Sequence, residues 1–384
     1  MKKFLTGVLA ALVLAQPAAA ASQAVSTAIG PNVSAAASIL MEKETGSILA
    51  EKNAHEQLAP ASVTKVMTML LVMEAFDSGR LSRDEMVTTS AYAAGMGGSQ
   101  VYLKEGEQLS AWEMLKCVAV ASGNDAAVAL AEHLAGSEEA FAAQMNQRAQ
   151  ELGMTNTHFL NCTGLPIEGH VTSAYDIALM SRELVLNHPQ LRELTTIWMD
   201  SIRNGEFGLT NTNRLVRFYA GATGLKTGST ESALYCISAT AEKGGMELIA
   251  VILKAPTSNE RFEDAKALLD YGFANYTLTT VTPSIPLAPV DVLLGVSSQV
   301  QPRLARECRI LVPKGSEQTI TTQIALVPDV EAPVDENQIL GQMEILVDGQ
   351  LWDSIPIVAS QPVDRLTVGG IFSRMMRQLL MAVE

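Results

Sequence analysis

The sequence is poor in the residues that build metal centres and disulfide frameworks. It has four cysteines in 384 residues (Cys117, Cys162, Cys236 and Cys308), and none of them forms a C-x-x-C pair. Its five histidines include no H-E-x-x-H motif, so we expect neither a metallohydrolase nor a metal or other cofactor. A chain of this length can build a full core without cross-links, so we expect four separate, mostly buried thiols. A disulfide is the alternative, and sequence does not name its partners.

Positive charge and long hydrophobic runs are also scarce. Lys and Arg number 27 against 41 Asp and Glu, and the net charge of -14 repels phosphate, which argues against a nucleic-acid binder. No apolar run reaches about 18 residues, which excludes a polytopic membrane protein. Hydrophobic residues make up 48% of the chain, too many for a mainly disordered protein, and the length suggests two or three domains.

The first 21 residues have the three parts of a secretory signal peptide. Lys2 and Lys3 form a positive start, residues 4–15 form an apolar stretch too short to span a bilayer, and residues 18–21 are alanines that offer an A-x-A cleavage site. An uncleaved anchor or a buried helix is the alternative. We therefore predict a signal peptide at 1–21 and a mature protein that works outside the cytoplasm.

Two different patterns divide the rest of the chain. Residues 36–278 alternate strand-like and helix-like segments. The expected elements are a hairpin at 38–50, an apolar helix at 63–76, a helix opened by a capping box at Ser110 and Glu113, a helix from Ser137 towards Gly153, two strands joined at Gly244 and Gly245, and a closing helix at 261–273. Nine of the 15 prolines lie beyond residue 280, where short strands at 309–312, 320–325 and 343–347 predict a small all-β domain at 280–366.

Ser62 and Lys65 stand three residues apart at the start of the apolar helix, so they share one face. Free backbone N–H groups at a helix start favour a developing oxyanion. Burial among Val66, Met67 and Leu70, together with a second nearby cation, lowers a lysine pKa, and a neutral lysine can take the proton of the serine. An N-cap serine beside a surface lysine is the alternative for an isolated S-x-x-K.

Two further short motifs follow along the chain. Ser122 and Asn124 frame an S-G-N motif in a break between two helical segments, and Lys226 begins a K-T-G motif before a β-hairpin. Each alone indicates an ordinary turn, although the glycine of K-T-G also permits a close backbone approach. In this order, S-x-x-K, a serine–asparagine motif and K-T-G are the signature of β-lactamases and penicillin-binding proteins.

The chain resembles the low-molecular-mass penicillin-binding proteins, specifically the serine-type D-alanyl-D-alanine carboxypeptidases. The resemblance covers nearly the whole mature sequence, including Gly164-Leu-Pro166 with His170, and the S-G-N form is typical of the carboxypeptidase branch. It implies an α/β (α+β) β-lactamase/transpeptidase-like domain at 36–278, with an antiparallel sheet flanked by helices. It also implies the all-β domain at 280–366 and a terminal amphipathic helix at 368–384.

The resemblance also implies catalytic roles. Ser62 is expected to be the acylated nucleophile and Lys65 its general base. Ser122 is expected to bridge Lys65 and Lys226 and to relay protons to the leaving group. The oxyanion hole is expected to use the backbone N–H groups of Ser62 and Ser229.

The remaining motif residues are implied to bind the substrate. Asn124 is expected to hold the peptide backbone of the substrate. Lys226, which is expected to stay protonated, and Thr227 face the terminal carboxylate, next to the close approach at Gly228. Arg261 matches a position that assists carboxylate binding in relatives, and a surface helix arginine is its alternative.

The implied reaction is removal of the terminal D-alanine from peptidoglycan stem peptides ending in D-Ala-D-Ala, through an acyl-enzyme on Ser62, which limits cross-linking. β-Lactams present the same carbonyl and are expected to acylate Ser62. A DD-endopeptidase uses the same machinery and stays open. A class A-like β-lactamase needs a deacylating glutamate, and Glu168 lies in no clear glutamate–asparagine pattern. A non-catalytic peptidoglycan-binding protein has no need of the intact motifs, and no G-x-S-x-G elbow of a Ser-His-Asp hydrolase is present.

The last residues predict a membrane anchor. Apolar residues recur at helical spacing on one side of 370–384, namely Ile371, Phe372, Met375, Met376, Leu379, Leu380 and Val383. Arg374 and Arg377 lie on the other side, and the stretch is too short to span a bilayer. We therefore expect a peripheral protein on the outer face of the cytoplasmic membrane. Packing on its own β domain or on a second copy is the alternative.

Overall fold

The computed structural model describes residues 30–316 and 318–381. These residues form two compact units. The larger unit contains residues 30–282 with 307–316 and 318, and the smaller contains residues 283–306 with 319–381. The predicted signal peptide at 1–21 and the last three residues of the predicted terminal helix lie outside the described residues.

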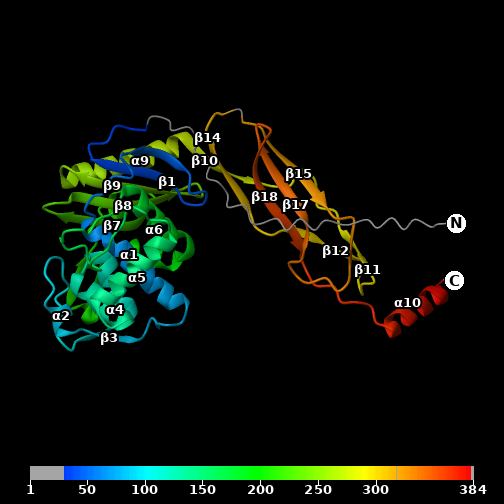
Figure 1. The fold of residues 1–384 in the computed structure, drawn as a ribbon, viewed down its shortest axis with the longest axis horizontal. Helices are drawn as coiled ribbons and strands as arrows, with labels where there is room; N and C mark the ends of the chain where they lie inside the picture. The colour runs from blue at the N-terminus through cyan, green and yellow to red at the C-terminus, as the bar shows by residue number, and fades with distance from the viewer. Residues whose placement is uncertain (1–29, 317, 382–384) are drawn as a thin grey trace, which may run out of the picture. The chain divides into compact units, whose positions relative to one another are not determined.

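The larger unit is built on a five-stranded antiparallel sheet (Figure 1). Its order is β2-β1-β9-β8-β7, with β1 (Ala37–Glu42), β2 (Ile48–Lys52), β7 (Ala222–Thr230), β8 (Leu234–Lys243) and β9 (Met246–Ala255). Alternate residues of a strand face opposite sides of a sheet. In β9, Val251 packs into one hydrophobic cluster and its neighbour Ile252 into another, so both faces of the sheet are covered.

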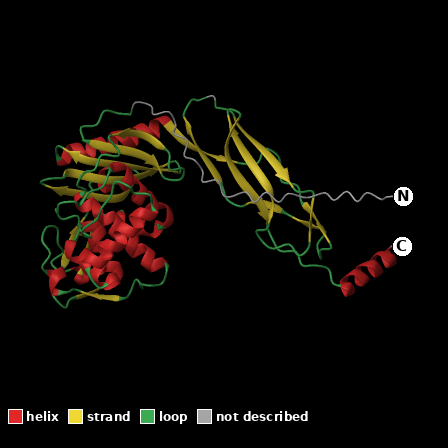
Figure 2. Cartoon of the chain, viewed as in Figure 1, coloured by secondary structure: helices red, strands yellow, loops and turns green. Residues whose placement is uncertain are grey.

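Helices cover both faces of the sheet (Figure 2). One face packs on α9 (Ser258–Asn275), and the other packs on the remaining long helices. These are α1 (Lys65–Asp77), α4 (Asn124–Ala135), α5 (Glu138–Glu151) and α6 (Ala174–Asn187), with shorter α2 (Ala91–Ala94), α3 (Ala111–Lys116), α7 (Arg192–Thr195) and α8 (Leu215–Phe218). Helix α1 is buried all round from Val66 to Met73, as its apolar sequence predicts.

Several local predictions are confirmed. Ser110 caps α3 by accepting from the backbone N–H of Glu113 at 3.2 Å, and Ser137 caps α5 in the same way. Gly244 and Gly245 have positive φ of 60° and 77° in the turn between β8 and β9. The helix opened by the capping box at Ser110 is short, because α3 passes into a π-helical turn (η2, Cys117–Ala121).

The larger unit also contains two small two-stranded sheets and two short 3-10 turns. They are β3 (Met86–Thr88) with β4 (Gln108–Ser110), β5 (Met199–Ile202) with β6 (Phe207–Thr210), η3 (Pro189–Leu191) and η4 (Arg203–Gly205).

The predicted domain boundary near residue 280 does not divide the chain into two continuous segments. The strand expected at 309–312 is β14 (Cys308–Pro313), and it pairs with β10 (Tyr276–Val281) of the larger unit. Leu311 is 3% exposed and joins the hydrophobic cluster under α9. Burial of this apolar side chain draws the segment into the larger unit, so the all-β domain predicted at 280–366 is interrupted.

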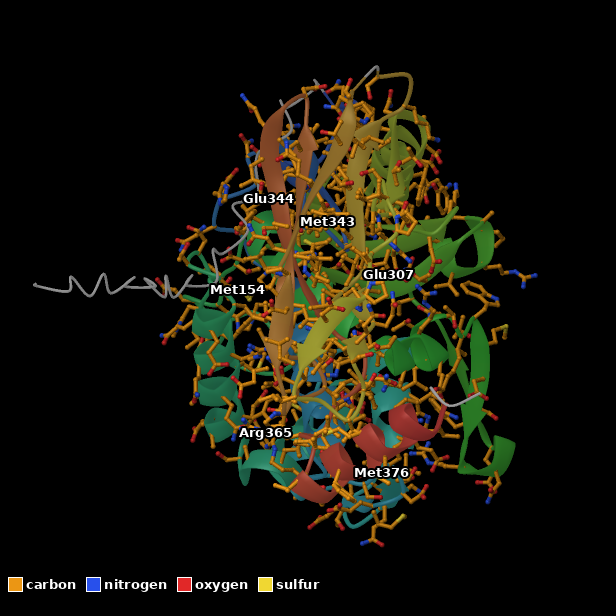
Figure 3. The ribbon with its side chains drawn as sticks, turned by 90° about the vertical axis from the view of Figure 1, so that its right-hand side faces the viewer. Met154, Glu307, Met343, Glu344, Arg365 and Met376 are labelled. Carbon is orange, nitrogen blue, oxygen red and sulfur yellow. The ribbon has the colours of Figure 1, made fainter. Side chains whose placement is uncertain are left out.

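The smaller unit consists of two β-sheets. Their orders are β12-β11-β16 and β13-β18-β17-β15. The strands are β11 (Val290–Leu293), β12 (Gln299–Val300), β13 (Pro302–Leu304), β15 (Ile320–Leu326), β16 (Asp329–Glu331), β17 (Ile339–Val347) and β18 (Gln350–Ala359). In β17, Met343 is buried and the next residue, Glu344, is half-buried (Figure 3). The helix expected from residue 368 is present as α10 (Val368–Met381).

Candidate active site

The predicted nucleophile lies on a tight turn before α1. Ser62 is half-buried in the 3-10 turn η1 (Ala61–Thr64), whereas the sequence predicted the first turn of an α-helix. The i to i+3 geometry of this turn keeps Ser62 and Lys65 together, as predicted. A hydrogen bond of 3.2 Å joins Lys65 Nζ to Ser62 Oγ.

Lys65 is fully buried, and its ammonium group is held by neutral acceptors. Besides Ser62, Nζ donates to Asn124 Oδ1 at 2.6 Å and to the backbone oxygen of Thr163 at 2.7 Å. Burial lowers the pKa of Lys65 to about 7, and the nearby anionic or ionisable groups of Cys162, Asp125 and Glu138 oppose that shift. A substantial fraction of this lysine is therefore uncharged at neutral pH and able to accept the proton of the serine.

The two polar side chains of the S-G-N motif differ in their hydrogen bonding. Ser122 ends the π-helical turn in the left-handed region with φ 63°, and its buried Oγ has no hydrogen-bond partner in the part of the chain that the structure describes. The expected bridge between Lys65 and Lys226 is therefore not made as hydrogen bonds here. Asn124 accepts from Lys65 and donates to the backbone oxygen of Gly97 at 2.6 Å, so its amide is bound within the protein.

The K-T-G motif lies on β7, the edge strand of the sheet. Lys226 is buried, and its Nζ donates to the backbone oxygen of Thr227 at 3.0 Å. Burial lowers the pKa of Lys226 well below its ordinary value, and the positive charges of Lys65 and Arg261 lower it further. The surroundings of Lys226 therefore oppose the protonated form that the sequence led us to expect. A bound carboxylate is the kind of partner that favours protonation. Thr227 donates to Thr212 at 2.7 Å.

Gly228 is the point where β7 meets the serine turn. A Cβ at this position would lie 2.8 Å from Ser62 N, 2.9 Å from Pro60 O and 2.9 Å from Val63 N. The close backbone approach predicted from K-T-G is thus present. It places the next residue, the exposed Ser229, beside the nucleophile turn.

Arg261 reaches the same strand from α9 and is not a surface residue. It is 7% exposed, and its Nη1 donates to the backbone oxygen of Gly228 at 3.1 Å. Its Nε is buried and unpartnered among the described residues. Burial lowers the pKa of Arg261 to about 10. The guanidinium is therefore a second buried cation on the K-T-G side of the site.

Two groups at the active site were not predicted from the sequence. The carbonyl of Thr163 binds Lys65, but a backbone group leaves no signal in side-chain identity. His170, noticed only as part of a motif, hydrogen-bonds through Nε2 to Thr64 Oγ1 at 2.8 Å, while its Nδ1 accepts from the Leu160 N–H at 3.1 Å. This pairing makes Nε2 the protonated nitrogen of a neutral ring, and burial lowers the pKa of His170 to about 4.

A cavity of about 340 Å³ opens beside the nucleophile turn. Ala61 lines one side, Thr230 at the end of β7 lines another, and residues 164–168 and His170 form further walls. Gly164, with φ 80°, lies so close to the turn that a Cβ there would be 1.8 Å from Ala61 O. The nucleophile turn, the end of β7 and this loop therefore border one cavity, which is lined by Ala61 next to Ser62 and by none of the S-x-x-K, S-G-N or K-T-G residues.

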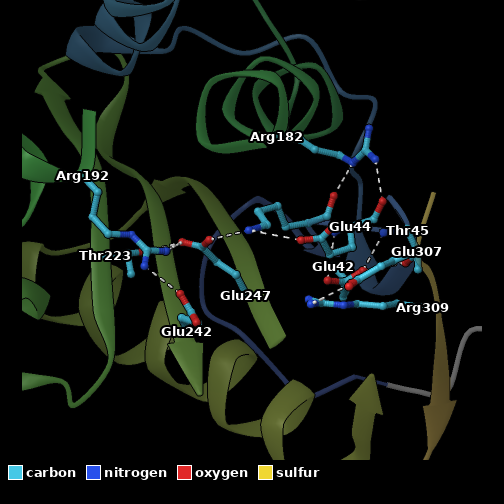
Figure 4. Close-up of polar contacts among 11 residues, drawn as sticks. Glu42, Glu44, Thr45, Arg182, Arg192, Thr223, Glu242, Glu247, Glu307 and Arg309 are labelled. Carbon is cyan, nitrogen blue, oxygen red and sulfur yellow. Dashed lines mark hydrogen bonds and ion pairs between the residues drawn. The ribbon is translucent and has the colours of Figure 1, made fainter. Parts of the chain in front are cut away.

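A separate polar cluster lies at the other end of β7 (Figure 4). Glu247 of β9, 2% exposed, pairs with Lys43 at 3.1 Å and with Arg192 at 2.8 Å. Arg182 of α6 donates to the backbone oxygens of Lys43 and Glu44, so it holds the β1–β2 turn. The adjoining cavity of about 220 Å³ is lined by Lys43, Arg192 and Glu247 of this cluster, whose ion pairs hold the β1–β2 turn and α7 to β9, so we assign this cluster a structural role.

Clustered metal ligands and membrane-spanning helices are both missing from the described residues. Within residues 30–316 and 318–381, no group of three or more His, Cys, Asp and Glu side chains is arranged to hold a metal ion. Over the same ranges, every helix is too short or too polar to cross a membrane. All four cysteines are buried.

Comparison with known proteins shows the family of this chain. The chain matches the D-alanyl-D-alanine carboxypeptidase family over residues 22–257 and the C-terminal domain of penicillin-binding protein 5 over residues 283–365. It is 42% identical over 336 residues to D-alanyl-D-alanine carboxypeptidase DacF of Bacillus subtilis, which covers 86% of each chain.

Solved structures show the same likeness. Penicillin-binding protein 5 from Haemophilus influenzae has a TM-score of 0.72 and 28% identity, covering 88% of this chain and all of its own. Penicillin-binding protein D2 from Listeria monocytogenes in its ampicillin-bound form has a TM-score of 0.56 and 35% identity, covering 63% of this chain and all of its own. The predicted fold class is thereby confirmed, and the chain belongs to the D-alanyl-D-alanine carboxypeptidase family of serine peptidases.

Proposed function

We propose that this family member removes the terminal D-alanine of peptidoglycan stem peptides through an acyl-enzyme on Ser62. Neutral Lys65 takes the proton of Ser62 Oγ as the oxygen attacks the carbonyl between the two D-alanines. The backbone N–H groups of Ser62 and Ser229 stabilise the oxyanion. The proton passes to the departing amine through Ser122, whose hydroxyl has no competing partner among the described residues, and water then releases the shortened peptide.

The terminal carboxylate of the substrate binds to the K-T-G side of the site. Lys226, Thr227 and Arg261 gather there, and the two cations among them are buried and donate to uncharged oxygens. Binding of a carboxylate compensates the cost of burying them and favours protonation of Lys226. The same carboxylate is present in a β-lactam, so we expect penicillins to acylate Ser62.

One observation carries this proposal, which is the buried Lys65 within 3.2 Å of Ser62 and held by neutral groups. The test is incubation with fluorescent penicillin followed by peptide mapping. We expect a covalent adduct on Ser62. Ser62→Ala abolishes both labelling and D-alanine release while costing at most about 1 kcal/mol of stability, and Lys65→Ala slows acylation severely. Wild-type labelling rates in either variant contradict the assigned roles.

We further propose that the mature protein lies on the outer face of the cytoplasmic membrane, held by residues 368–384. The support is the signal-like sequence at 1–21 and the apolar stripe of the terminal helix. Phe372 is 65% exposed and Met375 57%, and Met376, labelled in Figure 3, is 42% exposed. Exposed apolar side chains on one helix suit a lipid surface.

Truncation tests the membrane proposal. A variant that ends at Val368 is expected to leave the membrane fraction while keeping penicillin labelling, because the motif residues lie in the larger unit. If the truncated protein stays in the membrane fraction as strongly as the full-length mature protein, the helix is not the anchor. The control is a deletion of the short stretch at 22–29, which lies outside the proposed anchor.

A further inference from the structure

Glu138 begins α5 but directs its carboxylate away from that helix. Ser137 caps α5, so Glu138 is not needed as the cap. Glu138 Oε1 instead accepts from the backbone N–H of Cys162 at 3.0 Å and from its thiol at 3.2 Å. Oε2 accepts from the hydroxyl of Tyr92 at 2.8 Å. The carboxylate therefore fastens the loop around Cys162 to two helices.

That loop carries the carbonyl that holds the general base. The residue after Cys162 is Thr163, whose backbone oxygen accepts from Lys65 at 2.7 Å. The carbonyl of Cys162 itself accepts from Thr68 Oγ1 at 2.7 Å, one turn along α1 from Lys65. A shift of the Cys162 backbone therefore moves one of the three hydrogen-bond partners that Lys65 Nζ has within the described part of the chain.

The other half of the loop is fixed independently. Asn161 Oδ1 accepts from the N–H groups of Thr163 at 3.2 Å and Gly164 at 2.7 Å. The Cys162 N–H precedes these two groups in the chain and is bound by Glu138 instead of Asn161. Loss of Glu138 leaves this N–H without an acceptor and frees one side of the segment.

We propose that Glu138 is a positioning residue for Lys65, holding the Cys162–Thr163 segment so that Nζ stays within reach of Ser62, and supplying part of the negative charge around it. This inference rests on the proposed function, in which Lys65 is the general base. Four residues connect in one chain of contacts, from the Glu138 carboxylate through the Cys162 amide to the Thr163 carbonyl and Lys65.

The titratable groups that face Lys65 come from four elements. The carboxylates of Asp125 of α4 and Glu138 of α5 favour its protonated form, whereas Lys226 of β7 opposes it. Burial raises the pKa of the Cys162 thiol well above its ordinary value, so this group of the loop stays uncharged. The Asp125 carboxylate is held by backbone N–H groups within 3.2 Å. Removal of the Glu138 charge therefore leaves one carboxylate and lowers the pKa of Lys65 further.

Two substitutions separate position from charge. Glu138→Gln keeps an oxygen that can accept from the Cys162 N–H, removes the charge, and replaces the acceptor of the Tyr92 hydroxyl by an amide NH2. Glu138→Ala removes the oxygen as well as the charge. Glu139→Gln and Glu139→Ala are the matched controls, because Glu139 lies in the same first turn of α5 and is exposed. The Glu139 variants also remove a negative charge from the first turn of α5, so they show any effect on stability or rate that comes from that charge alone.

The experiment measures acylation by fluorescent penicillin between about pH 5 and pH 9, with thermal unfolding of each full-length mature variant. We expect the acid limb of the pH–rate profile of Glu138→Gln to move to lower pH, because Lys65 with a lower pKa stays neutral down to a lower pH. We expect Glu138→Ala to share that shift and also to lose about 10- to 100-fold in the acylation rate on the plateau above the acid limb, since small misplacements of a catalytic group have effects of that order.

The outcomes are distinguishable from failure of the proposed function. If Ser62→Ala abolishes labelling but Glu138→Ala and Glu138→Gln both keep the wild-type rate and acid limb, the positioning role is wrong and the proposed function stands. If the Glu139 variants lose as much rate as the Glu138 variants, the effect belongs to the start of α5 and the inference is again wrong. If the folded wild-type protein is not labelled, both proposals fall.

Discussion

Gly228 offers a steric test of how closely strand β7 must approach the nucleophile turn. A Cβ added here would lie 2.8 Å from Ser62 N and 2.9 Å from both Pro60 O and Val63 N. All three are backbone atoms, so no flexible side chain can move aside. In Gly228→Ala, β7 and η1 must therefore separate.

The size of the separation follows from van der Waals contact. Carbon atoms pack comfortably at about 3.5–4.0 Å, so the added methyl group requires a retreat of roughly half an ångström or more. Overpacking of this kind costs about 1–3 kcal/mol of stability. The same retreat moves the N–H of Ser229 away from the developing oxyanion. Because a misplacement of about 1 Å can cost about 100-fold in rate, we expect a loss of about tenfold or more.

The assay compares penicillin acylation rates and urea unfolding midpoints of Gly228→Ala with a matched glycine variant. Gly208 lies on β6, and a Cβ added there would have no atom within 4 Å. Gly208→Ala is therefore expected to change stability by less than about 1 kcal/mol and to leave the rate unchanged. If Gly228→Ala acylates at the wild-type rate, close contact of β7 with the serine turn is not required for the reaction.

Three other predictions follow from the site. Acylation is expected to rise with pH through about 7, because burial lowers the pKa of Lys65 to about 7 and only its neutral form accepts the proton; a flat pH profile of labelling contradicts this role. Ser122→Ala is expected to leave the free energy of unfolding within about 0.5 kcal/mol, since its hydroxyl has no hydrogen-bond partner among the described residues, yet to slow D-alanine release; unchanged turnover counts against the relay. The pKa of His170 is lowered by burial to about 4 from an ordinary value of about 6.5, so its contribution to stability, about 3 kcal/mol, is present above pH 6.5 and lost as pH falls towards 4. His170→Gln is expected to lose that part of the pH dependence in urea unfolding, and an unchanged dependence refutes the assignment.

Features that depend on neighbouring residues could be predicted from the sequence. Ser62 and Lys65 are three residues apart, so any helical turn places them together, and the 3-10 turn does so as well as an α-helix. The caps at Ser110 and Ser137 are equally local, because each serine accepts from an N–H three residues ahead. The family resemblance then supplied the meaning of the motifs, which propensity and periodicity do not contain.

Features that depend on distant segments were decided by the tertiary structure. Thr163 binds Lys65 through a carbonyl, Glu138 binds the Cys162 amide, and β14 leaves its predicted domain to pair with β10. Every residue carries a backbone N–H and C=O apart from proline, which lacks the N–H, so residue identity does not show which of these groups will meet a distant partner. The same applies to the lowered pKa of Lys226, because burial and neighbouring cations exist only once the chain has folded around it.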